Sequence, residues 1–333
     1  MNLQISLYKK ILKEKFNLTD DDNIEEIVSK NPKKYSIDKL YDINDLPNNK
    51  NQRFVLQHIY QNTFIPLNCI IWIEQNINNI EIYKLNKYIT IYIISDGEFS
   101  QKQHIFNIVN WISNFSKPKK LNLFIFLTPF KKVIKYKGQI LTRNEINSGV
   151  CYKYYKWIQI FRSEELLKVL IHELLHYYDL DCNTIDWIDE ILPIKTPCNS
   201  LLLNEAVTES MAIILHTYYY SLIMNQNLKI LLNKEIAYSK EMHDIILNHN
   251  DVKTLNDLFN VCHYTNVIPY YIIKYVFIED IEEAIENLFD KNKIKKYIIK
   301  KLIKYFNNFL NLNYNIKQLN YEISAKMSLL YLF

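Results

Sequence analysis

Residues 163–179 read SEELLKVLIHELLHYYD, and the spacing of their apolar residues predicts a helix that carries the motif H-E-x-x-H. Ser163 is the expected N-cap, and two glutamates follow it in the first turn, where the helix dipole favours negative charge. The motif places His172 and His176 one helical turn apart on the same face. Two imidazoles in this arrangement can bind one Zn²⁺, which takes nitrogen, sulfur and carboxylate ligands.

The glutamate inside the motif indicates a catalytic role for the predicted metal site. In an H-E-x-x-H helix this residue, here Glu173, points at the zinc-activated water and serves as the general base. The alternative is a surface helix that carries two unrelated histidines. The sequence on either side of the motif distinguishes a zinc site from such a surface helix.

Upstream of the motif, the sequence predicts a small sheet. β-branched and aromatic residues dominate the expected strands, and one stretch with helical spacing interrupts them. The predicted order is a hairpin of strands at 80–85 and 88–94, a helix at 101–115, and strands at 121–127 and 150–161. The last strand directly precedes the H-E-x-x-H helix.

Downstream of the motif, a pair of acidic residues lies on an apolar helical segment. Residues 203–212 read LNEAVTESMA, in which Glu205 and Glu209 share one helix face. A catalytic zinc needs three protein ligands and a water, and a carboxylate from this segment would complete a His₂Glu set. The chain is predicted to be mostly helical from about residue 200, with helices at 202–224, 228–248, 254–262, 267–289 and 291–310.

Together the two motifs closely resemble those of the gluzincins, the thermolysin-like and aminopeptidase-like zinc metallopeptidases. These families pair H-E-x-x-H with N-E-x-x-x-[D/E] on a later helix, and the resemblance covers roughly residues 80–222. It implies that Glu205 is the third zinc ligand and that Glu209 orients His172. It also implies an α+β fold: a zincin-like catalytic core, in which a small mixed sheet carries the active-site helix, followed by a mostly helical C-terminal lobe. A looser resemblance is to uncharacterised H-E-x-x-H proteins of large DNA viruses.

One departure from the gluzincin pattern leaves the third ligand open. His176 and Glu205 are separated by 28 residues, which is more than these families usually have. In the metzincin extension H-E-x-x-H-x-x-G-x-x-H, the glycine falls on Asp179 and the last histidine on Cys182. The metzincin pattern therefore fails, and Asp179 or Cys182 remains an alternative third ligand.

The resemblance also predicts which elements contact a substrate. A zincin holds an extended peptide along the edge strand before its active-site helix, so residues 150–161 have that role unless they form an ordinary core strand. The developing oxyanion needs a donor, usually Tyr or His from the C-terminal lobe. We expect His263 or Tyr264 to supply it, and Pro269-Tyr270-Tyr271 is the next segment to consider.

The pattern along the chain suggests three regions. They are an N-terminal, mostly helical region at 1–79, the zincin-like catalytic core at 80–222 and the helical C-terminal lobe at 223–333. In the first region we expect a helix at 3–16 and helical or irregular structure at 53–77, interrupted at a proline. The polar residues between these two stretches predict a cap and a turn.

Composition excludes several functional classes. With only three glycines the chain contains no phosphate-binding loop, so we expect no nucleotide, and a net charge of +4 is too small to indicate a nucleic-acid binder. Five cysteines without a C-x-x-C pair favour a reducing compartment. Residues 1–17 carry charges where a signal peptide needs an apolar core. We expect an intracellular (cytoplasmic) protein, or one enclosed in a virus particle.

Taken together, these patterns predict a zinc-dependent metallopeptidase that acts on a peptide or protein substrate. One alternative is a non-catalytic, zinc-stabilised scaffold or virion protein. Another is a basic protein that binds nucleic acid or membranes through residues 291–304, which contain seven lysines. We expect instead that these lysines form the solvated face of a packed helix.

Overall fold

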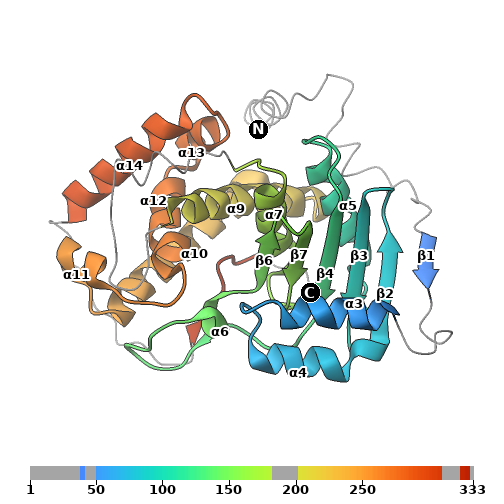
Figure 1. Cartoon of the computed structure of the whole chain (residues 1–333). Helices are drawn as coiled ribbons and strands as arrows, with labels where there is room; N and C mark the ends of the chain where they lie inside the picture. The colour runs from blue at the N-terminus through green and yellow to red at the C-terminus, as the bar shows by residue number, and fades with distance from the viewer. Residues whose placement is uncertain (1–37, 42–49, 182–201, 310–322, 331–333) are drawn as a thin grey trace, which may run out of the picture.

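The computed structural model describes residues 38–41, 50–181, 202–309 and 323–330. Within these ranges the protein is a mixed α+β structure. A sheet with its covering helices occupies the first half of the chain, and the second half is helical (Figure 1). The helix predicted at 3–16 lies outside the described residues.

A six-stranded mixed sheet forms the centre of the first half, in the order β1-β2-β3-β4-β7-β6. Its strands are Asp38–Tyr41 (β1), Ile80–Lys84 (β2), Ile89–Ile94 (β3), Leu121–Phe126 (β4), Gly149–Tyr152 (β6) and Trp157–Ile160 (β7). β2 and β3 form the predicted antiparallel hairpin, whereas β3, β4 and β7 run parallel. The edge strands β1 and β6 run antiparallel to their neighbours.

The single strand predicted at 150–161 is wrong. This stretch is a hairpin in which β6 and β7 are joined by a tight turn at 153–156. The turn reads Lys-Tyr-Tyr-Lys and has none of the Gly, Pro, Asn or Asp residues that mark turns, so the sequence concealed it. Lys156 adopts a φ of 61°, which helps the chain reverse. As a result, of these two strands only β6 lies at an edge of the sheet.

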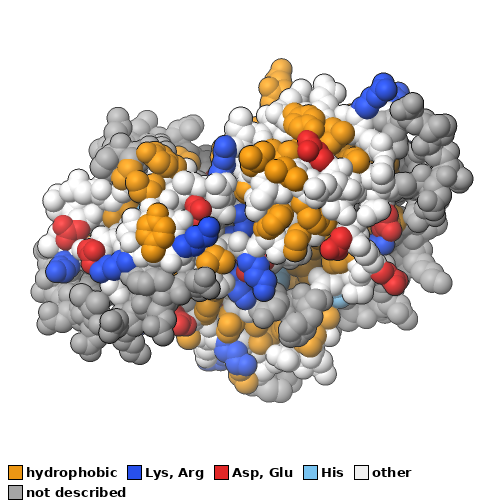
Figure 2. All heavy atoms as spheres, turned by 90° about the horizontal axis from the view of Figure 1, so that it is seen from below, with side chains coloured by type: hydrophobic (Ala, Val, Ile, Leu, Met, Phe, Trp, Pro, Cys, Tyr) orange, Lys and Arg blue, Asp and Glu red, His pale blue; other side chains and the backbone are white. Residues whose placement is uncertain are grey.

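Helices cover both faces of the sheet, as Figure 1 shows. They are α3 (Lys50–Tyr60) and α4 (Leu67–Gln75) on one face, and α5 (Lys102–Ser113) and α7 (Leu166–Tyr177) on the other. Pro66 precedes α4, at the predicted interruption. The outer side of α4 leaves Leu67 and Ile71 exposed, and hydrophobic side chains gather on this face of the molecule (Figure 2).

α7 begins two residues later than the N-cap at Ser163 predicts. Glu165 immediately precedes the helix with a φ of 58° and makes no capping hydrogen bond. The Ser163 hydroxyl donates instead to the Thr128 carbonyl at 3.0 Å. The Glu165 carboxylate forms a fully buried ion pair with Lys132. Contacts with distant segments therefore outweigh the local capping preference.

The second half of the described chain consists of helices and a short strand. The helices are α9 (Leu203–Ile223), α10 (Leu228–His249), α11 (Leu255–Asn260), the π-helix η3 (Ile268–Ile273), α12 (Lys274–Ile278), α13 (Ile281–Leu288) and α14 (Ile294–Phe309). The single helix predicted at 267–289 is wrong. Asp280 starts a new helix there by accepting the N–H of Glu283. The other four predicted helices are present.

α14 packs as a helix with one buried face. Ile294, Ile298 and Leu302 are buried along one side of the helix. The buried Lys301 lies 2.8 Å from Glu279, and other lysines of the helix pair with acidic residues of the preceding helices. These ion pairs neutralise part of the positive charge of α14.

Two further observations concern the cysteines and the helices. Cys69 and Cys151 are free thiols, whereas Cys262 is disulfide-bonded. Among the described helices, none combines the length and the apolar character needed to cross a bilayer.

Candidate metal centre

α7 carries two histidines whose ring nitrogens converge. The Nε2 atoms of His172 and His176 are 3.1 Å apart. Their rings meet edge to face, with 4.7 Å between centroids. The rest of α7 is almost entirely buried, which fixes the helix and directs this pair toward α9.

A carboxylate from the first turn of α9 completes the group. Glu205 Oε2 lies 3.4 Å from His172 Nε2 and 3.5 Å from His176 Nε2. In a tetrahedral zinc site with bonds of about 2.0–2.1 Å, neighbouring ligand atoms are about 3.3 Å apart. The distances among these three atoms are close to that value. We call His172, His176 and Glu205 the candidate metal centre.

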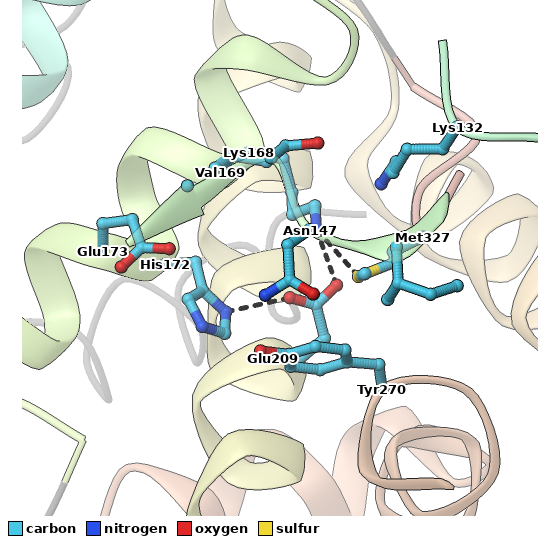
Figure 3. Close-up of a pocket in the computed structure, with 12 residues that line it drawn as sticks. Lys132, Asn147, Lys168, Val169, His172, Glu173, Glu209, Tyr270 and Met327 are labelled. Carbon is cyan, nitrogen blue, oxygen red and sulfur yellow. Dashed lines mark hydrogen bonds and ion pairs between the residues drawn. The ribbon is translucent and has the colours of Figure 1, made fainter. Parts of the chain in front are cut away.

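Glu209, one turn further along α9, holds the first histidine. Its Oε2 lies 2.9 Å from His172 Nδ1, and its Oε1 accepts a hydrogen bond from Lys168 Nζ at 2.7 Å. Figure 3 shows Glu209 between His172 on one side and Lys168 on the other. Burial opposes ionisation of Glu209, but Lys168 and His172 outweigh it and hold its pKa well below the usual range. The carboxylate can therefore accept the Nδ1–H and leave Nε2 free to bind a metal.

His176 is oriented by a residue that the sequence analysis did not select. Its Nδ1 lies 2.5 Å from Asp181 Oδ2. The same carboxylate oxygen accepts the Thr208 hydroxyl at 3.1 Å. Both histidines of the centre thus have a buried carboxylate at the nitrogen that faces away from it.

The end of α7 explains how Asp181 reaches the centre. The N–H of Leu180 donates to the Leu175 carbonyl at 2.9 Å, and Asp179 has a φ of 57°, as in a Schellman motif. This turn reverses the chain, so that the residue after it can contact His176. An aspartate at this offset was visible in the sequence, but its role depends on the helix ending where it does.

Neither alternative third ligand has support among the described residues. The Asp179 carboxylate lies 2.6 Å from Lys119 and 2.8 Å from Lys153. Asp179 therefore pairs with two lysines and is not among the residues whose donor atoms converge at the candidate metal centre. Cys182 lies outside the described residues.

Glu173 lies beside the edge strand. A Cβ atom added to Gly149 of β6 would lie 2.8 Å from both Glu173 Oε1 and Val169 Cγ1. The glycine therefore allows the carboxylate to approach the backbone of β6. Burial raises the pKa of Glu173 above its ordinary value, which makes this carboxylate a stronger base.

A small cavity adjoins the centre and contains a hydroxyl donor. Its volume is about 20 Å³, enough for one water molecule, and its lining includes His172, Glu173, Glu209, Asn147 and Tyr270 (Figure 3). The Tyr270 hydroxyl donates to Glu205 Oε2 at 2.9 Å. Tyr270 lies in the π-helix η3, and π-helical turns often occur at functional sites.

His263 and Tyr264, the predicted oxyanion donors, do not line this cavity. The Nδ1 atom of His263 accepts the N–H of Leu141 at 3.0 Å. Tyr264 is 65% exposed. The second segment considered from the sequence, which contains Tyr270, is the one that lies at the centre.

Removal of the Glu209 carboxylate is expected to weaken the centre without abolishing it. Glu209→Ala should raise the dissociation constant for zinc by roughly 10–100-fold, because His172 loses the acceptor that fixes its tautomer. A chelator competition titration measures this constant. The exposed Glu98, changed to alanine, is the control. Zinc affinity equal to that of the wild type would show that Glu209 does not orient a ligand.

Gly149→Ala is expected to displace Glu173 while leaving the metal ligands in place. The added methyl group would overlap both Glu173 Oε1 and Val169 Cγ1, so the carboxylate must move. If Glu173 is the general base that the sequence predicts, activity on peptides should fall by about tenfold or more with zinc content unchanged, since a small misplacement of a catalytic group is costly. Gly97→Ala is the matched control, because its Cβ would meet nothing within 4 Å. Full activity of Gly149→Ala would contradict the close approach of Glu173 to β6.

Comparisons of the chain with protein-family models, curated proteins and solved structures found no match.

Proposed function

We propose that this protein is a zinc-dependent metallopeptidase with a zincin-like catalytic core. The observation that carries the proposal is the spacing of three donor atoms, at 3.1, 3.4 and 3.5 Å, with Glu173 one residue after a ligand on the same helix. That spacing suits a tetrahedral ion. His172, His176 and Glu205 would hold the zinc.

The residues around the centre fit zinc in two ways. Two imidazoles and one carboxylate form a donor set that is typical of catalytic zinc sites, which keep a fourth position open. Each histidine also has a carboxylate at its other nitrogen, Glu209 for His172 and Asp181 for His176. Such partners fix the tautomer and increase the basicity of a zinc-bound histidine.

The chain supplies the groups that peptide hydrolysis needs. Bound zinc provides Lewis acidity, which polarises a carbonyl and lowers the pKa of water to about 7. Glu173, a base strengthened by burial, would accept a proton from the attacking water and pass it to the leaving amine. Burial and nearby carboxylates raise the pKa of Tyr270 well above its usual range, so its hydroxyl stays protonated and can donate to the oxyanion.

A peptide substrate would lie along β6. Among the described strands, β6 pairs only with β7, and we propose that its other edge pairs with an extended chain of the substrate. Strand addition at this edge would place the peptide backbone beside Gly149, and therefore next to Glu173. The proposal thus assigns to β6 the role that the sequence analysis gave to residues 150–161.

Zinc binding is expected to weaken as the pH falls below about 8. Burial opposes protonation of His172, but hydrogen bonds to Glu205 and Glu209 outweigh it and raise its pKa to about 8. Burial likewise opposes protonation of His176, but Glu205 and Asp181 raise its pKa well above the usual range. Protons therefore compete with the metal, and the dissociation constant should rise about tenfold or more per pH unit below 8.

The metal-free protein should show the opposite trend in stability. Because folding raises the pKa of His172 above about 6.5, its contribution is fully present below that pH and is lost as the pH rises through about 8. Thermal unfolding of metal-free and zinc-loaded protein across pH 6 to 9 measures both effects. Zinc affinity that does not change between pH 6 and 8 would contradict the ligand assignment.

The proposed activity can be tested with a diverse peptide mixture and mass spectrometry. We expect the zinc-loaded protein to cleave peptides, a chelator to stop the cleavage and added zinc to restore it. A protein that binds one zinc but cleaves no peptide would favour the non-catalytic scaffold.

A further inference from the structure

Residues 323–330 are partly buried next to the candidate metal centre, with four residues of the segment buried inside the protein. The short strand β8 (Ile323–Ser324) pairs with β5 (Val133–Ile134), and the chain then continues without regular secondary structure. Ala325 and Ser328 are fully buried in this segment. Its backbone polar groups therefore need partners other than a helix or a sheet.

Two buried carboxylates accept the N–H groups of the segment. Glu165 accepts from Met327 N at 2.8 Å and from Ser328 N at 2.6 Å. Glu235 of α10 accepts from the N–H groups of the next two residues at 3.0 and 2.8 Å, and from the Ser328 hydroxyl at 2.8 Å. Without the segment, both carboxylates would lose these donors in an interior that penalises unsatisfied charge, although Glu165 would keep its ion pair with Lys132.

Side-chain donors hold the carbonyl groups of the same segment. Tyr271 donates to the Ala325 carbonyl at 2.6 Å, and Tyr238 donates to the next carbonyl at 3.2 Å. Lys274 Nζ donates to the Met327 carbonyl at 2.9 Å. Most of these contacts are to the main chain, so they recognise a bent peptide backbone rather than a particular side chain.

The segment also contacts the residues that support the first histidine. Met327 Sδ lies 3.6 Å from Lys168 Nζ, the group that pairs with Glu209. Figure 3 shows Met327 on the side of Glu209 away from His172. A chain of contacts therefore runs from Met327 through Lys168 and Glu209 to His172.

We propose that Glu165, Glu235, Tyr238, Tyr271 and Lys274 form a binding site for a bent peptide backbone, the cradle, and that residues 323–330 are its internal ligand. The bound segment holds Lys168 and Glu209 in place behind His172. This second step rests on the proposed zinc centre, whereas the binding of the segment in the cradle does not.

A pair of variants at Leu329 tests the proposal in the full chain. Leu329 is 41% exposed, while its N–H donates to Glu235. Leu329→Pro removes this donor, and Leu329→Ala keeps it. We expect Leu329→Pro to speed amide hydrogen exchange across residues 325–330 and to raise the zinc dissociation constant roughly tenfold. Leu329→Ala should leave both unchanged. Faster exchange in Leu329→Pro with unchanged zinc affinity would overturn the link to the metal centre.

Peptide exchange tests the cradle without zinc. The full chain, with a site-specific protease sequence inserted after residue 315, is cut and kept in chelator. A fluorescent peptide of residues 320–333 should then replace the cut segment, and its anisotropy should rise. The same peptide with proline at 328 and 330 lacks two N–H donors and should not exchange in.

The two measurements fail in different ways. Equal incorporation of both peptides, or of neither, would overturn the cradle. If the wild-type protein binds no zinc, both the proposed function and the proposed effect of the segment on zinc affinity are wrong. The peptide-exchange experiment then still shows whether the cradle binds the segment.

Discussion

Glu173→Gln is expected to lose nearly all peptidase activity while retaining its zinc. The glutamine has the shape of the glutamate but cannot accept a proton, and removal of a general base typically lowers the rate by about 10²–10⁴. Zinc should stay bound because Glu173 is not among the three residues whose donor atoms converge. Steady-state peptide cleavage gives kcat/KM, and metal analysis of the same preparation gives the zinc content.

The matched control for this variant is Glu98→Gln, the same change at an exposed residue. It should keep both zinc and activity. A Glu173→Gln protein as active as the wild type would rule out Glu173 as the base. Loss of zinc from Glu173→Gln would instead show that this carboxylate holds the metal.

Replacement of any one of the three proposed ligands is expected to remove the zinc. His172→Ala, His176→Ala and Glu205→Ala each leave only two protein ligands, whereas a catalytic zinc site needs three. The loss of affinity should exceed the roughly 10–100-fold effect expected for Glu209, which contacts a ligand and not the ion. Equilibrium dialysis against buffered zinc measures all three variants and the wild type.

His58→Ala is the control for the histidine variants. His58 is half-buried on α3, and its Nδ1 lies 2.7 Å from the Phe54 carbonyl of the same helix. This variant should bind zinc as the wild type does. If Glu205→Ala retains its zinc and a variant of Asp179 or Cys182 loses it, the role of third ligand passes to that residue.

The parts of the site that were predictable from the sequence depend on local spacing. His172, Glu173 and His176 lie on one helix, and Glu205 and Glu209 on another, so the period of 3.6 residues fixes each set by itself. The structure brings both sets together. The hairpin of β2 and β3 was also predictable from local sequence, because its strands are short runs of β-forming residues separated by a turn.

The parts that were not predictable depend on tertiary contacts. Asp181 reaches His176 only because α7 ends in a left-handed turn at Asp179. Glu165 lies before the first turn of α7 because its carboxylate binds Lys132 and the N–H groups of Met327 and Ser328. The sequence pattern around one residue of such a contact does not indicate which distant residue it will contact.

The hairpin of β6 and β7 illustrates a different cause. Its turn lacks the residues that mark turns, so the aromatic sequence on both sides looked like one strand. The structure separates the strands and places β6 at the edge of the sheet. Gly149, one of three glycines in the chain, begins β6, where it makes room for Glu173.

The most direct test of the account is an anomalous difference map from a crystal of the zinc-loaded protein, with data collected on both sides of the zinc absorption edge. We predict one strong peak at about 2.0–2.2 Å from His172 Nε2, His176 Nε2 and a carboxylate oxygen of Glu205. A peak coordinated by other residues, or no peak between these three, would contradict the proposed zinc centre.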